Sequence, residues 1–153
     1  MAFKVFVDSN VLLRATFAGM NDHEACQATL DRLIDTDHEL WISHQVIREF
    51  CVNATREDTF AKENAPQPHY KWILDVVDLL PVRFSIADED ANVRSKFLGL
   101  MHRERIVGKQ LHDANIVATM QVNDIDTLVT RNERHFRRFS RIRLLSPTQD
   151  LAL

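Results

Sequence analysis

Short β-prone apolar runs alternate with longer helical segments along this chain, and that alternation is what most constrains its fold. We expect five short strands, at residues 3–7, 40–43, 81–84, 126–130 and 142–145. Strands separated by helices pair in parallel, with helices packed on both faces of the sheet. The pattern therefore predicts an α/β fold around a central, mostly parallel sheet, whose functional site lies beyond the carboxyl ends of its strands.

Between these runs, apolar side chains recur at the spacing of an amphipathic helix, which predicts helices there. Two helices are expected to begin at capping residues, one after Asp8-Ser9-Asn10 and one at Ser43. Further helices are expected at residues 22–36, 70–79, 86–106 and 112–122, with a short basic turn or helix at 132–139. The polar stretch 56–69 contains two prolines, and we expect a loop or a frayed helix end there.

The length of 153 residues fits one domain, and we expect residues 1–153 to form it. No apolar stretch approaches the ~18 residues that a membrane-spanning helix requires. Because the start lacks the apolar run and cleavage site of a signal peptide, we expect a cytoplasmic protein without membrane contact. Cys26 and Cys51 are too few for a disulfide scaffold and are expected to be free thiols.

The basic side chains are distributed unevenly. The whole chain carries a net charge of −3, yet residues 127–143 contain six arginines and one acid, Glu133. Such a cluster on an acidic body can hold a phosphate chain or an acidic partner protein, or it can form a solvated surface. The three glycines form neither GxxxxGK nor GxGxxG, so phosphate-cradling loops of those kinds are absent from the sequence.

Three acids lie near the ends of expected elements. Asp8 follows the first strand, Glu49 lies on the helix after the second, and Asp113 lies near the start of a helix with small apolar residues. Each alone also fits an ordinary structural role, as a helix cap or an exposed side chain. Together they indicate an oxygen-ligand site for Mg²⁺ or Mn²⁺, because clustered carboxylates need a cation and no cysteine or histidine cluster favours zinc. Such ions activate water for attack on a phosphodiester.

Four segments, FVDSNVLL, VIREF, KQLHDANIVATM and LVTRNERHF, in this order and spacing, resemble a PIN-domain ribonuclease. The branch that the chain resembles most is the VapC-like toxins of type II toxin–antitoxin systems. The resemblance extends over essentially the whole chain, including the ending RFSRIRLLSP. It implies a three-layer α/β/α sandwich and Mg²⁺- or Mn²⁺-dependent cleavage of RNA.

The resemblance also implies roles for individual residues. Asp8, Glu49 and Asp113 match the catalytic, metal-binding acids of the family. The supporting polar positions would be Asn10, Thr130, Asn132 and Glu133. Many members carry a fourth acid directly before the phenylalanine of the last motif, whereas this chain has His135 before Phe136. Either Asn132 or Glu133 substitutes for that acid, or the site works with three, and one or two ions bind.

Partners follow from the same resemblance. It implies an RNA substrate, a small cognate antitoxin that covers the acidic crevice, and a homodimer. Arg131, Arg134 and Arg138 are candidates for contacts with RNA phosphates or with the antitoxin. His112 and His135 are candidate proton carriers, although the sequence fits better with surface or supporting histidines that have no catalytic role.

Two other functions remain open from the sequence. A non-catalytic PIN fold that only binds RNA or a partner is compatible with the His135 departure. A haloacid-dehalogenase-like phosphatase also begins with a strand ending in aspartate, but it needs a second aspartate where this chain has Asn10. An amide cannot protonate a leaving group, which weighs against the phosphatase.

Overall fold

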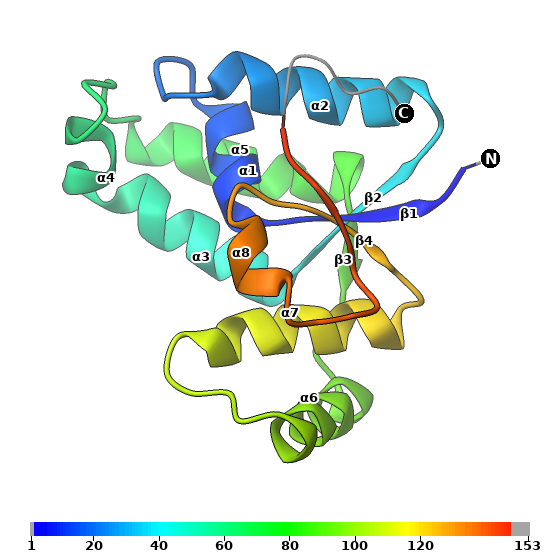
Figure 1. Cartoon of the computed structure of the whole chain (residues 1–153). Helices are drawn as coiled ribbons and strands as arrows, with labels where there is room; N and C mark the ends of the chain where they lie inside the picture. Colours follow the sequence, from blue (N-terminus) through cyan, green and yellow to red (C-terminus); the bar gives the residue numbers. More distant parts are fainter. Residues whose placement is uncertain (1, 148–153) are drawn as a thin grey trace.

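The centre of the molecule is a five-stranded, entirely parallel sheet with the strand order β3-β2-β1-β4-β5 (Figure 1). The computed structural model describes residues 2–147. The strands are β1 (Lys4–Val7), β2 (Glu39–Ser43), β3 (Ser85–Ala87), β4 (Thr127–Val129) and β5 (Arg143–Leu145). The expected α/β fold with a parallel sheet is confirmed.

Helices cover both faces of this sheet and so form the outer two of three layers. Within residues 2–147 they are α1 (Ser9–Thr16), α2 (His23–Asp35), α3 (His44–Thr55), α4 (Glu57–Ala61), α5 (Tyr70–Arg83), α6 (Ala91–Arg103), α7 (Gln110–Val122) and α8 (Glu133–Phe136). α1 and α2 lie on one side of the sheet, and α7 with α6 beyond it lies on the other (Figure 1). No helix among the described residues is long and apolar enough to cross a bilayer.

The chain order places the switch point of the sheet between β1 and β4. From β1 the chain runs outward through β2 to β3, and it then returns to the opposite side of β1 to form β4 and β5. The backbone N–H of Asp8 donates to the carbonyl oxygen of Val129 over 3.0 Å, which closes the β1–β4 pair at its carboxyl end. Crevices at such switch points are the usual ligand sites of parallel sheets.

Aromatic packing anchors the helices beside the sheet. The ring of Phe17 stacks on Phe50 with centroids 5.7 Å apart, and it meets the rings of Phe60 and Trp72 edge-on. The short helix α4 forms in the stretch 56–69, where the sequence predicts a loop or a frayed helix end. Phe60 of this helix is fully buried and packs against Phe17. Offset and edge-on ring pairs of this kind stabilise a core beyond the area that they bury.

The largest departures from the sequence-based prediction of element boundaries lie on either side of β3. The expected strand at 81–84 is wrong: α5 continues through Pro81 to Arg83, and β3 begins only at Ser85. Helical bonding persists after the proline, since the N–H of Phe84 donates to Leu80 over 2.9 Å. The helix expected from residue 86 begins at 91, because Asp90 caps it by accepting from the N–H groups of Asn92 and Val93.

Candidate active site

Asp8 lies at the carboxyl end of β1, where it caps helix α1. Its side chain is 6% exposed. The carboxylate Oδ1 accepts from the backbone N–H of Ser9 over 2.8 Å, and Oδ2 accepts from the Thr130 hydroxyl over 2.7 Å. The Asn10 amide also donates to Oδ2, at a longer 3.4 Å. Three donors from two segments therefore fix this carboxylate at the switch point of the sheet.

The surroundings of Asp8 hold the pKa of its carboxyl group at about 6, well above the ordinary 3.8. Burial is the main cause, because it penalises the charged form. The hydrogen bond from Thr130 opposes the shift, whereas the negative charges of Glu49 and Asp113 add to it. A carboxylate kept at such a cost in free energy is typical of a functional site.

Glu49 and Asp113 come from different elements but belong to the same electrostatic site. The Ser9 hydroxyl donates to Glu49 Oε2 over 2.8 Å, so the residue next to Asp8 holds this second acid on α3. Asp113 lies in the first turn of α7 and is half-buried. Burial raises the pKa of Asp113, and the charge of Glu49 raises it further. All three pairs among these acids thus interact.

The donors around Asp8 fit an oxygen-preferring divalent cation. They are carboxylates whose mutual repulsion raises the pKa of Asp8 and of Asp113, and a cation would relieve that repulsion. Within residues 2–147 no three His, Cys, Asp or Glu side chains form a ready-made ligand group. The fit therefore rests on donor chemistry and on charge. Asp8, Asp113 and Glu49 are the residues that would hold the ion.

The polar residues after β4 support this site through the backbone as well as through side chains. Thr130 is fully buried, and its hydroxyl accepts from the N–H of Asn132 over 3.0 Å while it donates to Asp8. Asn10 Oδ1 accepts from the N–H of Arg131 over 3.3 Å. The turn after β4 is thereby fastened to the start of α1.

His135, which occupies the place of the family's fourth acid, and Glu133, a candidate to substitute for that acid, lie in different surroundings. His135 stands beside Asp113, with Nδ1 3.8 Å from Asp113 Oδ2, and its positive charge would lower the pKa of that acid. Glu133 instead accepts from the Ser146 hydroxyl over 2.6 Å and pairs with Arg137 at 3.6 Å. Of these two residues, His135 is the one whose contacts among residues 2–147 include an acid of the site.

Two of the three arginines singled out in the sequence have partners inside the molecule. Arg131 donates to Asp22 from Nε and Nη2, over 3.1 and 2.6 Å. Arg138 pairs with Glu104 at 3.0 Å and donates to Gln110 over 2.9 Å. Arg134 is exposed and has no hydrogen-bond or ion-pair partner among residues 2–147. It is the one of the three whose charge is not offset within the described structure.

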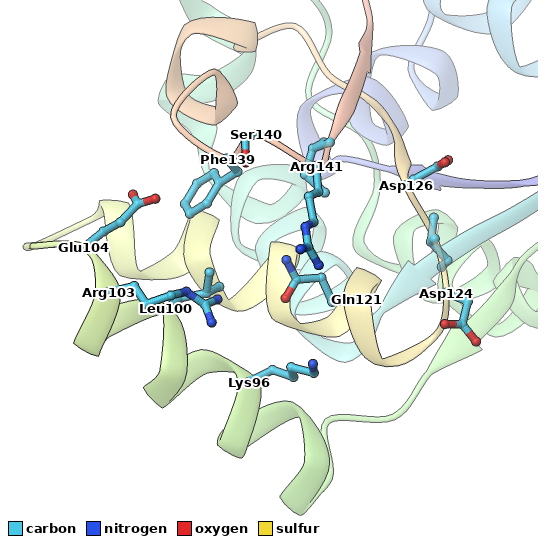
Figure 2. A pocket seen from close by; sticks show the side chains of 12 residues that line it. Lys96, Leu100, Arg103, Glu104, Gln121, Asp124, Asp126, Phe139, Ser140 and Arg141 are labelled. Atoms are coloured by element: carbon cyan, nitrogen blue, oxygen red, sulfur yellow. The ribbon is translucent and has the colours of Figure 1, made fainter.

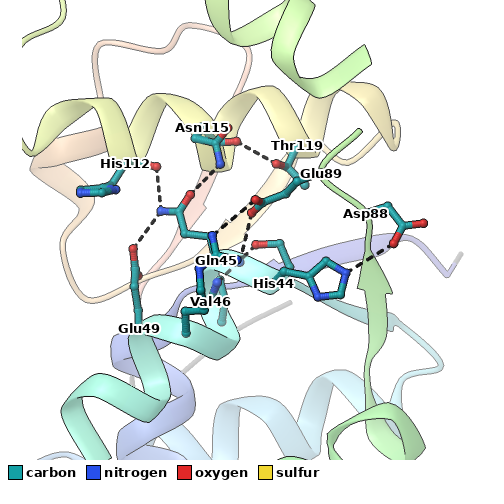
Figure 3. Close-up of polar contacts among 11 residues, drawn as sticks. His44, Gln45, Val46, Glu49, Asp88, Glu89, His112, Asn115 and Thr119 are labelled. Carbon is teal, nitrogen blue, oxygen red and sulfur yellow. Dashed lines mark hydrogen bonds and ion pairs between the residues drawn. The ribbon is translucent and has the colours of Figure 1, made fainter. Parts of the chain in front are cut away.

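Gln45 is a site residue that sequence reasoning missed. Its amide nitrogen donates to Glu49 Oε1 over 2.8 Å and to the carbonyl oxygen of His112 over 3.0 Å, and its oxygen accepts from Asn115 over 2.7 Å. Figure 3 shows this buried side chain bridging α3 and α7. The available signal was its spacing, since Gln45 precedes Glu49 by one helical turn on the face that carries buried Val46.

The chain was compared with known protein families and structures. A family model described as PIN domain matches residues 5–142. No curated protein sequence matches the chain significantly.

Several solved structures share the fold. VapBC2 from Rickettsia felis, bound to a DNA fragment from its promoter, aligns with a TM-score of 0.64 at 19% identity, over 94% of this chain and 98% of that one. A toxin–antitoxin complex from Klebsiella pneumoniae aligns with a TM-score of 0.64 at 19% identity, over 95% and 99%. VapC20 of Mycobacterium tuberculosis, a toxin that cleaves the sarcin-ricin loop, aligns with a TM-score of 0.58 at 14% identity, over 81% and 86%.

Proposed function

This chain belongs to the PIN domain family, and from that membership we propose that it is a metal-dependent endoribonuclease, the toxin of a toxin–antitoxin pair. The observation that carries the proposal is the group of three interacting acids at the switch point, with Asp8 buried and its pKa raised to about 6. A purely structural helix cap has no need of two further acids that oppose its ionisation. The proposed substrate is RNA and the proposed cofactor is Mg²⁺ or Mn²⁺.

The proposed chemistry is hydrolysis of an RNA phosphodiester. When bound, a divalent cation supplies Lewis-acid activation of water and neutralises charge on the phosphate. Thr130 and the N–H of Ser9 hold Asp8 in one orientation, and their hydrogen bonds favour its ionised form. The Ser9 hydroxyl and the Gln45 amide donate to the two oxygens of Glu49 and hold that side chain in one orientation. The fixed carboxylates thus require little rearrangement to bind cation and substrate.

Proton transfer is assigned to the histidines beside Asp113. His135 and His112 are exposed, and both lower the pKa of Asp113 when they carry charge. An imidazole at this place can pass a proton between the reacting groups and solvent. His135 therefore serves the site as a base or acid where other family members would carry a fourth carboxylate.

The partners are proposed from charge and from the relatives. Arg134, free of internal partners among residues 2–147, is the arginine best able to contact an RNA phosphate. Structures with the same fold include toxin–antitoxin complexes, and a small antitoxin is the proposed regulator of this chain. We further propose that the protein acts in the cytoplasm as a homodimer of single-domain chains.

RNA cleavage by the purified protein tests the function. We expect cleavage with Mg²⁺ or Mn²⁺, none in EDTA, and a loss of at least about 100-fold in Asp113→Asn, as is usual when a group that acts in the transition state is removed. Asp75→Asn is the matched control, because Asp75 is exposed on α5 and, among residues 2–147, pairs with Lys71 alone. Equal cleavage by wild type and Asp113→Asn would contradict the mechanism, and RNA binding without cleavage would favour a non-catalytic PIN fold.

A further inference from the structure

The arginine-rich segment, residues 127–143, contains a cation, Arg141, that the proposed active site does not use. Arg137 pairs with Glu133, Arg138 pairs with Glu104, and the Arg143 guanidinium lies 6.0 Å from the centre of the Phe3 ring. Arg141, in contrast, has no hydrogen-bond or ion-pair partner in the part of the chain that the structure describes. It lines a cavity of about 750 Å³ instead.

This cavity lies at the opposite edge of the sheet from Asp8. Its walls come from α6, from the end of α7 and from the segments that precede β4 and β5. Gln121 in its wall and Asp113 in the acidic site are eight residues apart on α7, about 12 Å along the helix axis. The cavity is therefore a separate feature, within the size range of small-ligand pockets.

Three unpaired cations meet at this cavity. Lys96 and Arg103 lie seven residues apart on α6, on the same face as Leu100, and Arg141 approaches from the segment before β5. Within residues 2–147 neither Lys96 nor Arg103 has a hydrogen-bond or ion-pair partner. Figure 2 shows these three side chains and the Gln121 amide around one space. Their mutual repulsion would be relieved by a bound anion.

The acids of the cavity wall offset this charge only in part. Glu104 is already paired with Arg138 at 3.0 Å. Asp126 accepts a hydrogen bond from the Thr127 hydroxyl over 2.9 Å. The carboxylates of Asp126 and Asp124 lie at one margin of the cavity, away from Arg103 (Figure 2). The interior that Arg103 and Arg141 face is thus positively charged.

We propose that this cavity binds the phosphate group of a nucleotide. Two guanidinium groups suit a phosphate, because each can donate two parallel hydrogen bonds to its oxygens, and the Lys96 ammonium adds a third charge. Gln121 can donate a further hydrogen bond, while Leu100 and Phe139 supply an apolar wall for the attached sugar and base. The nucleotide is either free in solution or one unit of an RNA strand that extends beyond the acidic site.

Calorimetric titration with AMP in EDTA tests the proposal without any cleavage. We expect saturable binding by wild type and a loss of about tenfold or more in the double variant Arg103→Gln/Arg141→Gln, which removes both guanidinium groups. Arg94→Gln is the matched control, because Arg94 lies on the same helix, is exposed and does not line the cavity. Its affinity for AMP should equal that of the wild type.

Two further titrations identify the source of the phosphate. If inorganic phosphate binds the wild type but not the double variant, and RNA affinity is unchanged, the ligand of the cavity is a free phosphate compound. A short RNA whose affinity falls in the double variant but not in Arg94→Gln assigns it to the RNA strand. The proposal is overturned if AMP, phosphate and RNA all fail to bind, or if they bind the double variant as tightly as wild type. RNA cleavage by the same double variant is measured separately: wild-type cleavage together with lost AMP binding shows that this cavity and the acidic site act independently.

Discussion

The hydroxyl of Thr130 donates a hydrogen bond of 2.7 Å to Oδ2 of Asp8, so that the residue after β4 orients the residue after β1. These strands are neighbours in the sheet although 122 positions separate the two residues. The bond opposes the rise in the pKa of Asp8 that burial causes. A neutral hydroxyl thereby helps to keep a buried carboxylate ionised among other acids.

Replacing Thr130 tests this relationship. Thr130→Val keeps the shape of the side chain but removes the donor to Asp8 and the acceptor for the N–H of Asn132. We expect the pKa of Asp8 in the metal-free protein to rise further, and unfolding should cost about 1–3 kcal/mol less. Cleavage should be slower than in wild type, and the deficit should grow as the pH is lowered. Thr130→Ser, which retains the hydroxyl, should behave as wild type. Identical pH profiles for the valine and serine variants would contradict the account.

The raised pKa of Asp8 predicts how the stability of the metal-free protein depends on pH. The folded-state pKa of about 6 exceeds the ordinary 3.8, so between these values the folded chain binds the proton more tightly than the unfolded chain. The free energy of unfolding should therefore fall as pH rises from 3.8 to about 6, and this contribution should then stay constant. Glu49 and Asp113 contribute to this pH dependence, because their negative charges raise the pKa of Asp8.

Asp8→Asn removes the free-energy cost of keeping a charged carboxylate at this buried position. At pH 7.5 in EDTA the variant should be more stable than wild type by about 2–3 kcal/mol, and the difference should close below pH 4. Urea unfolding at a series of pH values measures it, with Asp75→Asn as the exposed control. An Asp8→Asn variant that is no more stable than wild type at pH 7.5 would show that Asp8 ionises there without cost.

Much of the fold follows from local sequence patterns. The β1 strand is predictable from its run of β-prone apolar residues, although its hydrogen bonds join the distant strands β2 and β4. The Ser43 cap is predictable because its bond is local: the Ser43 hydroxyl accepts from the N–H of Val46, three positions further on. The end of α5 was missed for a physical reason. Pro81 removes one helical hydrogen bond, but the surrounding turns of the helix persist through it.

The polar contacts of the site were harder to predict, because they join segments that are far apart in the chain. Arg131 pairs with Asp22 across 109 positions, and Arg138 with Glu104 across 34. Nothing in the arginine-rich segment itself distinguishes these paired arginines from the unpaired Arg134. Gln45 was missed likewise, since its partners His112 and Asn115 lie on another helix. The sequence predicts where the acids lie, because they stand near the ends of predicted strands and helices. Their hydrogen-bond partners can be identified only from the tertiary structure.

Gln45 is predicted to hold Glu49 in place. Gln45→Met keeps the length of the side chain but leaves the Asn115 amide and the His112 carbonyl without their partner. We expect a loss of about 2 kcal/mol in unfolding free energy and a lower cleavage rate at saturating RNA. Gln67→Met is the control, because exposed Gln67 makes one comparable bond, to the carbonyl oxygen of Ala54. Wild-type cleavage by Gln45→Met would remove its role at the site.

Replacing Arg134 and replacing Arg138 should have different effects on the salt dependence of RNA binding. Arg134→Gln should lower RNA affinity and reduce the slope of log affinity against log salt by about 0.7, the value for one phosphate contact on a single strand. Arg138→Gln should leave that slope unchanged and cost at most about 1 kcal/mol of stability, because it breaks an exposed pair with Glu104. Fluorescence anisotropy with labelled RNA in EDTA measures both slopes. A larger change in slope for Arg138→Gln would reverse the assignment.

Whether Asp8, Glu49 and Asp113 bind a divalent cation is tested most directly by an anomalous-difference map from a crystal of the protein soaked in Mn²⁺. We expect a peak among the three carboxylates and its disappearance in a crystal of Asp8→Asn. Mn²⁺ density elsewhere, with no peak at these three acids under saturating Mn²⁺, would contradict the account.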